Sequence, residues 1–307
     1  GSYVRTVEAD IILSPTSGNF FLFSRQPFSR MGCCASKNLD PELPPTLGAG
    51  VEQLSTVTPD ADIAAVRELL VRSFSGAPGT RPEASLSWCL GDANAADRET
   101  PGDHYSKRTV DAPAETIAAI GWVVDYSLAC SVRHGGVFVL RDDDGKIVAA
   151  TACYAPNDAH LHDPGMCDQL ALGVSMPPAV CMAPRMTALG KAMGEAHKAC
   201  ASGPHVYVSV FATATGEQGK GYGKRMLTHI AAWADHLGVP TYLETTGEGN
   251  VKFYGKLGFE VAQKLALSAG ADSYEGCVAM VRKPASSGDA SDSSGNLGGK
   301  TATVAPE

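Results

Sequence analysis

The stretch GEQGKGYGKR, from Gly216 to Arg225, places four glycines within eight residues. It follows HVYVSVFAT, a run rich in β-branched residues that predicts a strand. It leads into GYGKRMLTHIAAWADHLG, whose apolar spacing predicts an amphipathic helix. Glycine lets a backbone approach a ligand closely, and a helix start offers N–H groups and a positive dipole end. The sequence therefore predicts a phosphate-binding loop at this turn.

Three kinds of phosphate loop can be compared with this stretch. A P-loop requires Lys and then Ser or Thr after its last glycine, whereas Tyr222 and Gly223 follow Gly221. A dinucleotide loop requires G-x-G-x-x-G, which the even glycine spacing does not match, although Glu244 lies at about the distance of a ribose-binding acid. That interpretation stays as an alternative. The pattern Q-x-x-G-x-G, starting at Gln218, predicts a loop that wraps the pyrophosphate of coenzyme A with backbone N–H groups.

A second motif lies further along the chain. NVKFYGKLGFEV, from Asn250 to Val261, follows the predicted strand TYLETT. With these two motifs in this order and spacing, the chain resembles the GNAT superfamily of N-acetyltransferases. The resemblance implies an α/β fold with a central mixed, mostly antiparallel sheet, splayed between strands 4 and 5 and flanked by helices. The chain departs from the family at Thr213-Ala214-Thr215, where many members carry Val-x-Pro.

The resemblance also implies an activity. The co-substrate is acetyl-CoA, no metal is needed, and the segments GGVFVL and ATACYAP are most similar to members that act on small amines and antibiotics. The expected acceptor is therefore a primary amine of a small molecule. No cysteine lies at a predicted nucleophile position, so we expect direct attack in a ternary complex. Two alternatives on the same fold stay open: acetylation of protein amines, and a non-catalytic module that binds acyl-CoA.

The acetyl-CoA site implied by the resemblance combines a strand end, the glycine loop and the second motif. Its residues are Phe211, Ala212, Thr213, Gln218, Gly219, Lys220, Gly221, Tyr222, Gly223, Lys224, Asn250 and Phe253. Tyr254 matches the general acid of the family, which protonates the departing thiolate. An amine with a pKa near 10 is mostly protonated at neutral pH, so a base is needed. Glu244 is the candidate, acting directly or through water, and a plain surface or cap carboxylate is its alternative interpretation.

Other polar residues receive structural interpretations. Asn250 is expected to cap a short helix, because Asn is a favoured N-cap. His205 stands at a strand start and is interpreted as a hydrogen-bonded polar residue rather than as the base. Four further residues could be interpreted as metal ligands, but their spacing does not match that of a known metal site, so no metal site is predicted. These residues are His160, His162, Asp163 and Cys167.

The chain divides into three parts. Residues 1–50 are expected to form a flexible extension, 51–284 the transferase domain, and 285–307 a disordered tail, because both ends carry too few apolar groups to offset the entropy of ordering.

Within the domain we expect a strand from Val51, a helix with Thr58 as N-cap, and a loop over 88–103. A helix ended by a glycine stop at 134–136 follows, and then a hairpin that turns at Asp144-Gly145. Residues 157–184 are read as an irregular cover, followed by the helix RMTALGKAMGEAHKAC.

Composition limits the partners and the compartment. The net charge is -8 and Lys and Arg do not cluster, which disfavours a nucleic-acid partner. The nine cysteines lack paired spacing and no leader segment opens the chain, which predicts a reducing, cytoplasmic location. No apolar run approaches the roughly 18–20 residues of a spanning helix.

One motif lies outside this scheme. MGCCASK, from Met31 to Lys37, fits M-G-x-x-x-[ST], with Gly32 as a myristate acceptor and Cys33 and Cys34 as palmitoylation candidates. Two lipid signals would anchor the enzyme peripherally to the cytoplasmic face of a membrane. The interpretation requires translation to start at Met31; otherwise the two cysteines are ordinary thiols in a loose tail. The oligomeric state does not follow from the sequence.

Overall fold

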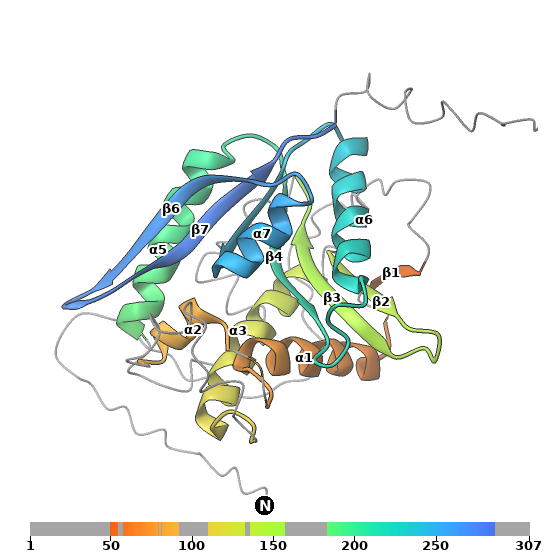
Figure 1. Ribbon diagram of the computed structural model, residues 1–307, viewed down its shortest axis with the longest axis horizontal. Coiled ribbons are helices and arrows are strands. Elements are labelled where there is room, and N and C mark those ends of the chain that lie inside the picture. Colours follow the sequence, from red (N-terminus) through yellow and green to blue (C-terminus); the bar gives the residue numbers. More distant parts are fainter. Residues whose placement is uncertain are drawn as a thin grey trace, which may run out of the picture.

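The computed structural model describes residues 50–54, 58–78, 80, 82–91, 110–132, 136–156 and 183–285 (Figure 1). The strands are β1 (Val51–Leu54), β2 (Val137–Arg141), β3 (Ile147–Tyr154), β4 (Val206–Thr213), β5 (Thr241–Thr246), β6 (Glu260–Ala269) and β7 (Asp272–Arg282). The helices are α1 (Asp60–Ser75), α2 (Ala84–Cys89), α3 (Ala114–Val132), α5 (Ala183–Cys200), α6 (Tyr222–His236) and α7 (Glu248–Gly255).

The strands form a seven-stranded sheet in the order β1-β2-β3-β4-β5-β7-β6. Among the strands that the structure describes, β4 and β5 run parallel and every other neighbouring pair is antiparallel. The predicted mixed, mostly antiparallel sheet is confirmed. The alternative of a dinucleotide-binding fold is wrong, because that fold needs a mostly parallel, doubly wound sheet.

The sheet is splayed between β4 and β5, as predicted. The two strands pair only from Val206 opposite Thr241 to Val208 opposite Leu243. Beyond that point β4 stays paired with β3 and β5 stays paired with β7, so the two strands separate. A β-bulge at Ser209 accompanies the separation, because neighbouring β3 residues lie opposite Val208 and Val210. A gap therefore opens in the middle of the sheet.

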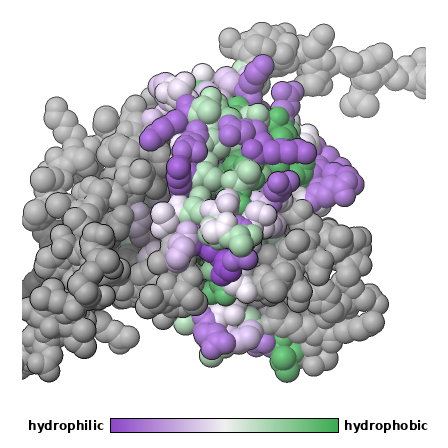
Figure 2. All heavy atoms as spheres, turned by 90° about the vertical axis from the view of Figure 1, so that its left-hand side faces the viewer, coloured by the Kyte–Doolittle hydropathy of each residue, from purple (hydrophilic) through white to green (hydrophobic). Residues whose placement is uncertain are grey.

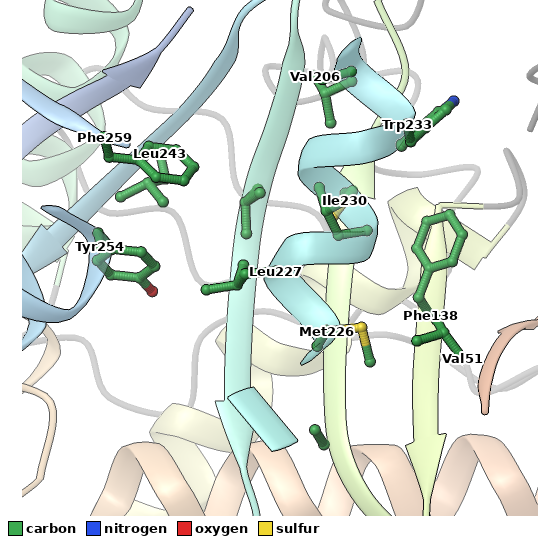
Figure 3. Packing of buried hydrophobic residues seen from close by; sticks show 14 of the residues in the cluster. Val51, Phe138, Val206, Met226, Leu227, Ile230, Trp233, Leu243, Tyr254 and Phe259 are labelled. Carbon is green, nitrogen blue, oxygen red and sulfur yellow. The ribbon is translucent and has the colours of Figure 1, made fainter. Parts of the chain in front are cut away.

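Helices cover both faces of the sheet (Figure 1). α6 and α7 pack on one face, and α1, α2, α3 and α5 pack on the other. The predicted stripe of α6 is confirmed: Met226, Ile230 and Trp233 are buried and lie against the strands, as Figure 3 shows, while Leu237 follows the helix as a half-buried residue. Burial of an Ile or Met side chain contributes about 1.5–3 kcal/mol, so this stripe fixes α6 on the sheet.

Several local predictions are confirmed and two are wrong. The hairpin of β2 and β3 turns at Gly145, which has φ 80, and α3 forms as expected. Thr58 is not the N-cap of α1: Pro59 occupies that position without a side-chain cap, and Asp60 and Asp62 in the first turn interact favourably with the helix dipole instead. The expected loop over 88–103 is wrong at its start, because Trp88 and Cys89 belong to α2.

The side of the molecule at which the β6–β7 hairpin ends has a mixed surface. Figure 2 shows hydrophilic and hydrophobic side chains interspersed over its coloured part. Among the described residues, the exposed large hydrophobic side chains are Val110 and Val261. Scattered apolar side chains of this kind are ordinary on the surface of a folded domain.

Some predictions fall outside the described residues. These are the lipidation motif at 31–37, the residues read as metal ligands between 160 and 167, most of the irregular segment 157–184, and His134 and Gly135 of the glycine stop. Within the described part of the chain, no helix combines the length and the apolar character that crossing a membrane requires.

Candidate active site

A cavity of about 520 Å³ lies at the glycine loop, where β4 leaves β5. It is lined by every predicted coenzyme-binding residue except Lys220, together with Ser73, Glu217 and Tyr254. The ammonium of Lys220 instead pairs with Glu217 at 2.7 Å and is exposed. Residues from β4, the loop and α7, which are separate in sequence, are therefore brought together around one space.

The glycine loop has the geometry of an anion site. Gly216, Gly219 and Gly221 have φ between 82 and 89, a range that L side chains rarely adopt. Gly221 is the N-cap of α6 and has no side chain to cap the first turn, whose residues Tyr222, Gly223 and Lys224 line the cavity. A Cβ atom at Gly223 would lie 3.1 Å from Thr213 Oγ1 and 3.3 Å from the Phe211 ring. At Gly216, Gly219 and Gly221, by contrast, a Cβ atom would meet nothing within 4 Å, so the loop leaves room for close approach of a pyrophosphate to the backbone.

A second cavity, of about 560 Å³, adjoins the first. Both cavities are lined by Ser73, Ala212, Gln218 and Asn250. The second cavity lies between the segment that joins α1 to α2 and the segment that joins β5 to α7. The gap between β4 and β5 therefore connects a space beside the glycine loop with a space beside α1 and α2.

A hydrogen bond bridges the two sides of the second cavity. Thr246, the last residue of β5, donates its hydroxyl to Glu83 Oε1 at 2.7 Å. Glu83 is also the N-cap of α2 and accepts bonds from the backbone N–H groups of Ser85 and Leu86. One carboxylate therefore fixes the start of α2 and ties it to the end of the splayed strand.

Tyr254, the predicted general acid, lies in the first cavity. Its ring is 8% exposed and makes edge contacts with Phe253 and Phe259 at centroid distances of 5.3 and 5.7 Å. Burial raises the pKa of the hydroxyl above its usual value, so the group stays protonated at neutral pH. Figure 3 shows Tyr254 on the same side of β5 as Leu243. A protonated phenol in this position can donate a proton into the cavity.

Glu244, the predicted base, lies on the opposite face of the sheet. It follows Leu243, the last β5 residue that pairs with β4, and it accepts a hydrogen bond from Tyr242 at 2.8 Å. Burial raises its pKa to about 7, while hydrogen bonds from Tyr242 and Tyr207 oppose that rise. Glu244 lines neither cavity, but Thr246, two residues further along the same face of β5, lines the second.

The remaining candidates have structural positions. Asn250 is not the N-cap of α7, because the helix begins two residues earlier with Gly247 as N-cap; its side-chain amide donates to the Thr246 carbonyl at 2.9 Å. Both ring nitrogens of His205 are engaged, by His197 and by the Gly203 carbonyl. Trp88, at the start of the expected loop over 88–103, packs in the core beside α5 and lines neither cavity.

The sequence prediction missed the residues from the α1–α2 region. Ser73 lines both cavities and donates to the Thr213 carbonyl at 3.3 Å, and Glu83 lines the second cavity. Glu is an uncommon N-cap, so the start of α2 carried little signal. Within the residues that the structure describes, no group of three or more His, Cys, Asp or Glu side chains could hold a metal ion.

Comparison with known proteins identifies the family. The model of the acetyltransferase (GNAT) family matches residues 103–259, which is more than half of the 307-residue chain. The chain belongs to the GNAT acetyltransferase family. It is therefore an acetyl-CoA-dependent N-acetyltransferase, and the family implies acetyl-CoA as its co-substrate. The glycine loop and the uncapped start of α6 fit the pyrophosphate of that molecule.

Three solved structures that this acetyltransferase matches share little sequence identity with it. One, described as a histone acetyltransferase and related acetyltransferase from Corynebacterium glutamicum, is 20% identical, with a TM-score of 0.42 over 77% of this chain and 96% of that chain. An agmatine N-acetyltransferase is 16% identical, with a TM-score of 0.45 over 76% and 98%. A mosquito arylalkylamine N-acetyltransferase-like protein is 15% identical, with a TM-score of 0.41 over the same shares. No curated protein matches the chain.

Proposed function

We propose that the enzyme transfers the acetyl group of acetyl-CoA to a primary amine of a small molecule, by direct attack in a ternary complex. The observation that carries this proposal is the second cavity, which adjoins the space beside the glycine loop and is crossed by the bond from Thr246 to Glu83. Its volume of about 560 Å³ is within the usual range for small-molecule sites. A cavity of this volume accommodates a small acceptor.

Each residue of the site then has a role. When bound, acetyl-CoA supplies an acetyl group on an activated thioester. The glycine loop from Gln218 to Lys224 and the end of β4 hold the coenzyme through backbone N–H groups. Glu244 lines neither cavity, so it accepts a proton from the amine through water, and the nitrogen lone pair becomes available. Tyr254 donates a proton to the sulfur as the carbon–sulfur bond breaks and the carbon–nitrogen bond forms.

The first test separates coenzyme binding from acceptor choice. Calorimetric titration with acetyl-CoA should show micromolar binding that weakens more than about tenfold in Gly221→Asp, because the new carboxylate repels the pyrophosphate at the helix start. The matched control is Gly190→Asp, which adds the same charge on α5, where a Cβ atom meets nothing within 4 Å. Equal binding by the two variants would show that the loop does not hold the coenzyme.

The second test compares acceptors by release of the coenzyme A thiol. Small primary amines should be turned over, and a lysine peptide of equal concentration should not. Faster turnover of the peptide would favour a protein acceptor. Coenzyme binding without turnover of either class, with equal affinity in Tyr254→Phe, would favour a non-catalytic binding module.

We also propose a domain assignment and a location. Residues 51–284 form the transferase domain, in the cytoplasm, and in a chain that starts at Met31 the motif at 31–37 carries myristate on Gly32 and palmitate on Cys33 and Cys34. Mass spectrometry of the N-terminal peptide from native cells tests this. An unmodified peptide that contains Gly1 would contradict the lipid anchor.

A further inference from the structure

Two tyrosines are placed side by side at the point where the sheet opens. Tyr207 of β4 lies opposite Tyr242 of β5 in the short parallel pairing, one position before that pairing ends. Partners in neighbouring strands point their side chains to the same face, and residues two apart along a strand share a face. Tyr207, Tyr242 and Glu244 therefore all face the α5 side of the sheet. The end of the pairing determines this arrangement.

Both phenols donate to the Glu244 carboxylate. The Tyr242 hydroxyl lies 2.8 Å from Glu244 Oε1, and Tyr207 also makes a side-chain hydrogen bond to Glu244. Burial raises the pKa of both tyrosines above the usual value, and the nearby negative charge of Glu244 is the second-largest cause of the rise. Both hydroxyls are therefore protonated at neutral pH, so they act only as donors to an ionised carboxylate.

The two rings are held in place by a buried aromatic cluster. His197 of α5 stacks on Tyr242 with ring centroids 4.4 Å apart and an interplanar angle of 11°, and it contacts Tyr207 at 4.8 Å. On the other side of β4, Tyr154 of β3 lies opposite Tyr207 and stacks on it at 5.7 Å. Tyr207 and Tyr242 are 6% and 0% exposed. Because the rings have little freedom to move, the two hydroxyls present fixed donors.

Other titratable groups on this side include two cysteines and two histidines. Cys200 of α5 interacts electrostatically with Glu244, and Cys277 of β7 interacts with Tyr242. The pKa of His205, which bonds to His197 behind the tyrosine rings, is lowered by burial. No ion pair joins Glu244 to a Lys or Arg among the described residues. The ionised carboxylate is therefore stabilised mainly by the two phenols.

We propose that Tyr207 and Tyr242 are positioning residues, which hold the Glu244 carboxylate at the opening between β4 and β5 so that it accepts the proton of the acceptor amine. The inference rests on the proposed function, because it assigns these tyrosines to the base of that reaction. It adds that the base depends on the strand pairing, because one of the three residue pairs that end at the gap, Tyr207 with Tyr242, supplies its donors.

The test removes one hydroxyl at a time. In Tyr242→Phe and Tyr207→Phe, loss of a hydrogen bond to the ionised carboxylate should raise the pKa of Glu244, so the acid limb of kcat/KM for the amine should move up by about 0.5–1 pH unit. KM for acetyl-CoA should not change. The matched control is Tyr154→Phe, which removes a hydroxyl from the same cluster; this hydroxyl interacts with Ser131 and Cys130. Its acid limb should stay in place.

A second measurement does not depend on catalysis. Difference infrared spectroscopy of the free protein, with Glu244→Gln as the reference, follows the protonated carboxyl band of Glu244 as the pH changes. Its midpoint should rise in both Phe variants and stay unchanged in Tyr154→Phe. An unchanged midpoint in both would overturn the inference, whereas a shifted midpoint without any shift in the rate profile would uphold the contacts and contradict Glu244 as the base.

Discussion

The two faces of the sheet differ in how they surround the opening between β4 and β5. On the α7 face, Tyr254 is packed between phenylalanine rings. On the α5 face, Glu244 is surrounded by donor hydroxyls. Burial raises the pKa of both groups, because it favours the neutral form of any acid. For the tyrosine this secures a proton donor, while for the glutamate it gives a pKa of about 7, where the group can accept a proton. In the proposed mechanism, one physical effect thus prepares opposite roles on the two faces.

The largest expected effect comes from removing the carboxylate. Glu244→Gln should lower kcat/KM for the amine about 100-fold at pH 8, because general base catalysis typically contributes 10²–10⁴-fold. The acid limb near pH 7 should disappear, since protonation of Glu244 below its pKa of about 7 is what removes the base in the wild type. A pH–rate profile checks both. A variant that keeps its acid limb would place the base elsewhere.

A smaller loss is expected on the opposite face. Tyr254→Phe should lower kcat about 10–100-fold, because the departing thiolate is a better leaving group than an amine and needs less assistance from an acid. The affinity for acetyl-CoA should be unchanged, because the ring packing stays. Single-turnover kinetics with calorimetry separate the two quantities. If affinity and kcat fell together, the hydroxyl would be a binding group and the contrast between the faces would weaken.

Stability should distinguish the faces as well. Between the usual Glu pKa of 4.5 and the folded value of about 7, the folded protein binds more protons than the unfolded chain, so wild-type stability falls as pH rises through this window. The stability of Glu244→Gln does not fall in this way. Its free energy of unfolding relative to the wild type should therefore rise by about 1–3 kcal/mol between pH 5 and pH 8. Urea unfolding at both pH values measures the difference. Tyr254→Phe is the control, because its hydroxyl is neutral throughout and its stability difference should not vary with pH.

The smallest effect concerns the bridge across the second cavity. Thr246→Val removes the hydroxyl that donates to Glu83, at nearly constant volume, and should cost about 1 kcal/mol of stability. KM for the small amine should rise, because the cavity loses its tie between α2 and β5, while the affinity for acetyl-CoA should stay constant. Unchanged KM would show that the bridge only supports the fold.

The residues that the sequence identified on the α7 face and those that it missed differ in a simple way. The glycine loop, the α6 stripe and the motif around Tyr254 are local patterns, in which spacing along the chain already determines which side chains lie together. Glu244 was found as a candidate, but its donors were not, because Tyr207 and Tyr242 meet it only through strand pairing. The N-caps at Thr58 and Asn250 were predicted wrongly, because the path of the backbone, rather than the preference of one residue type, decides where a helix starts.

The sequence by itself determined the strands, the long helix, the glycine loop and the family, because each depends on neighbours a few residues apart. Only the tertiary structure decided which residues surround the opening. Thr246 bonds to Glu83, which is 163 residues away in the sequence, and the parallel pairing of β4 with β5 brings two phenols to one carboxylate. Such contacts depend on where the β4–β5 pairing stops and on where the α1–α2 segment meets the end of β5. Those are properties of the packed chain, and no local pattern encodes them.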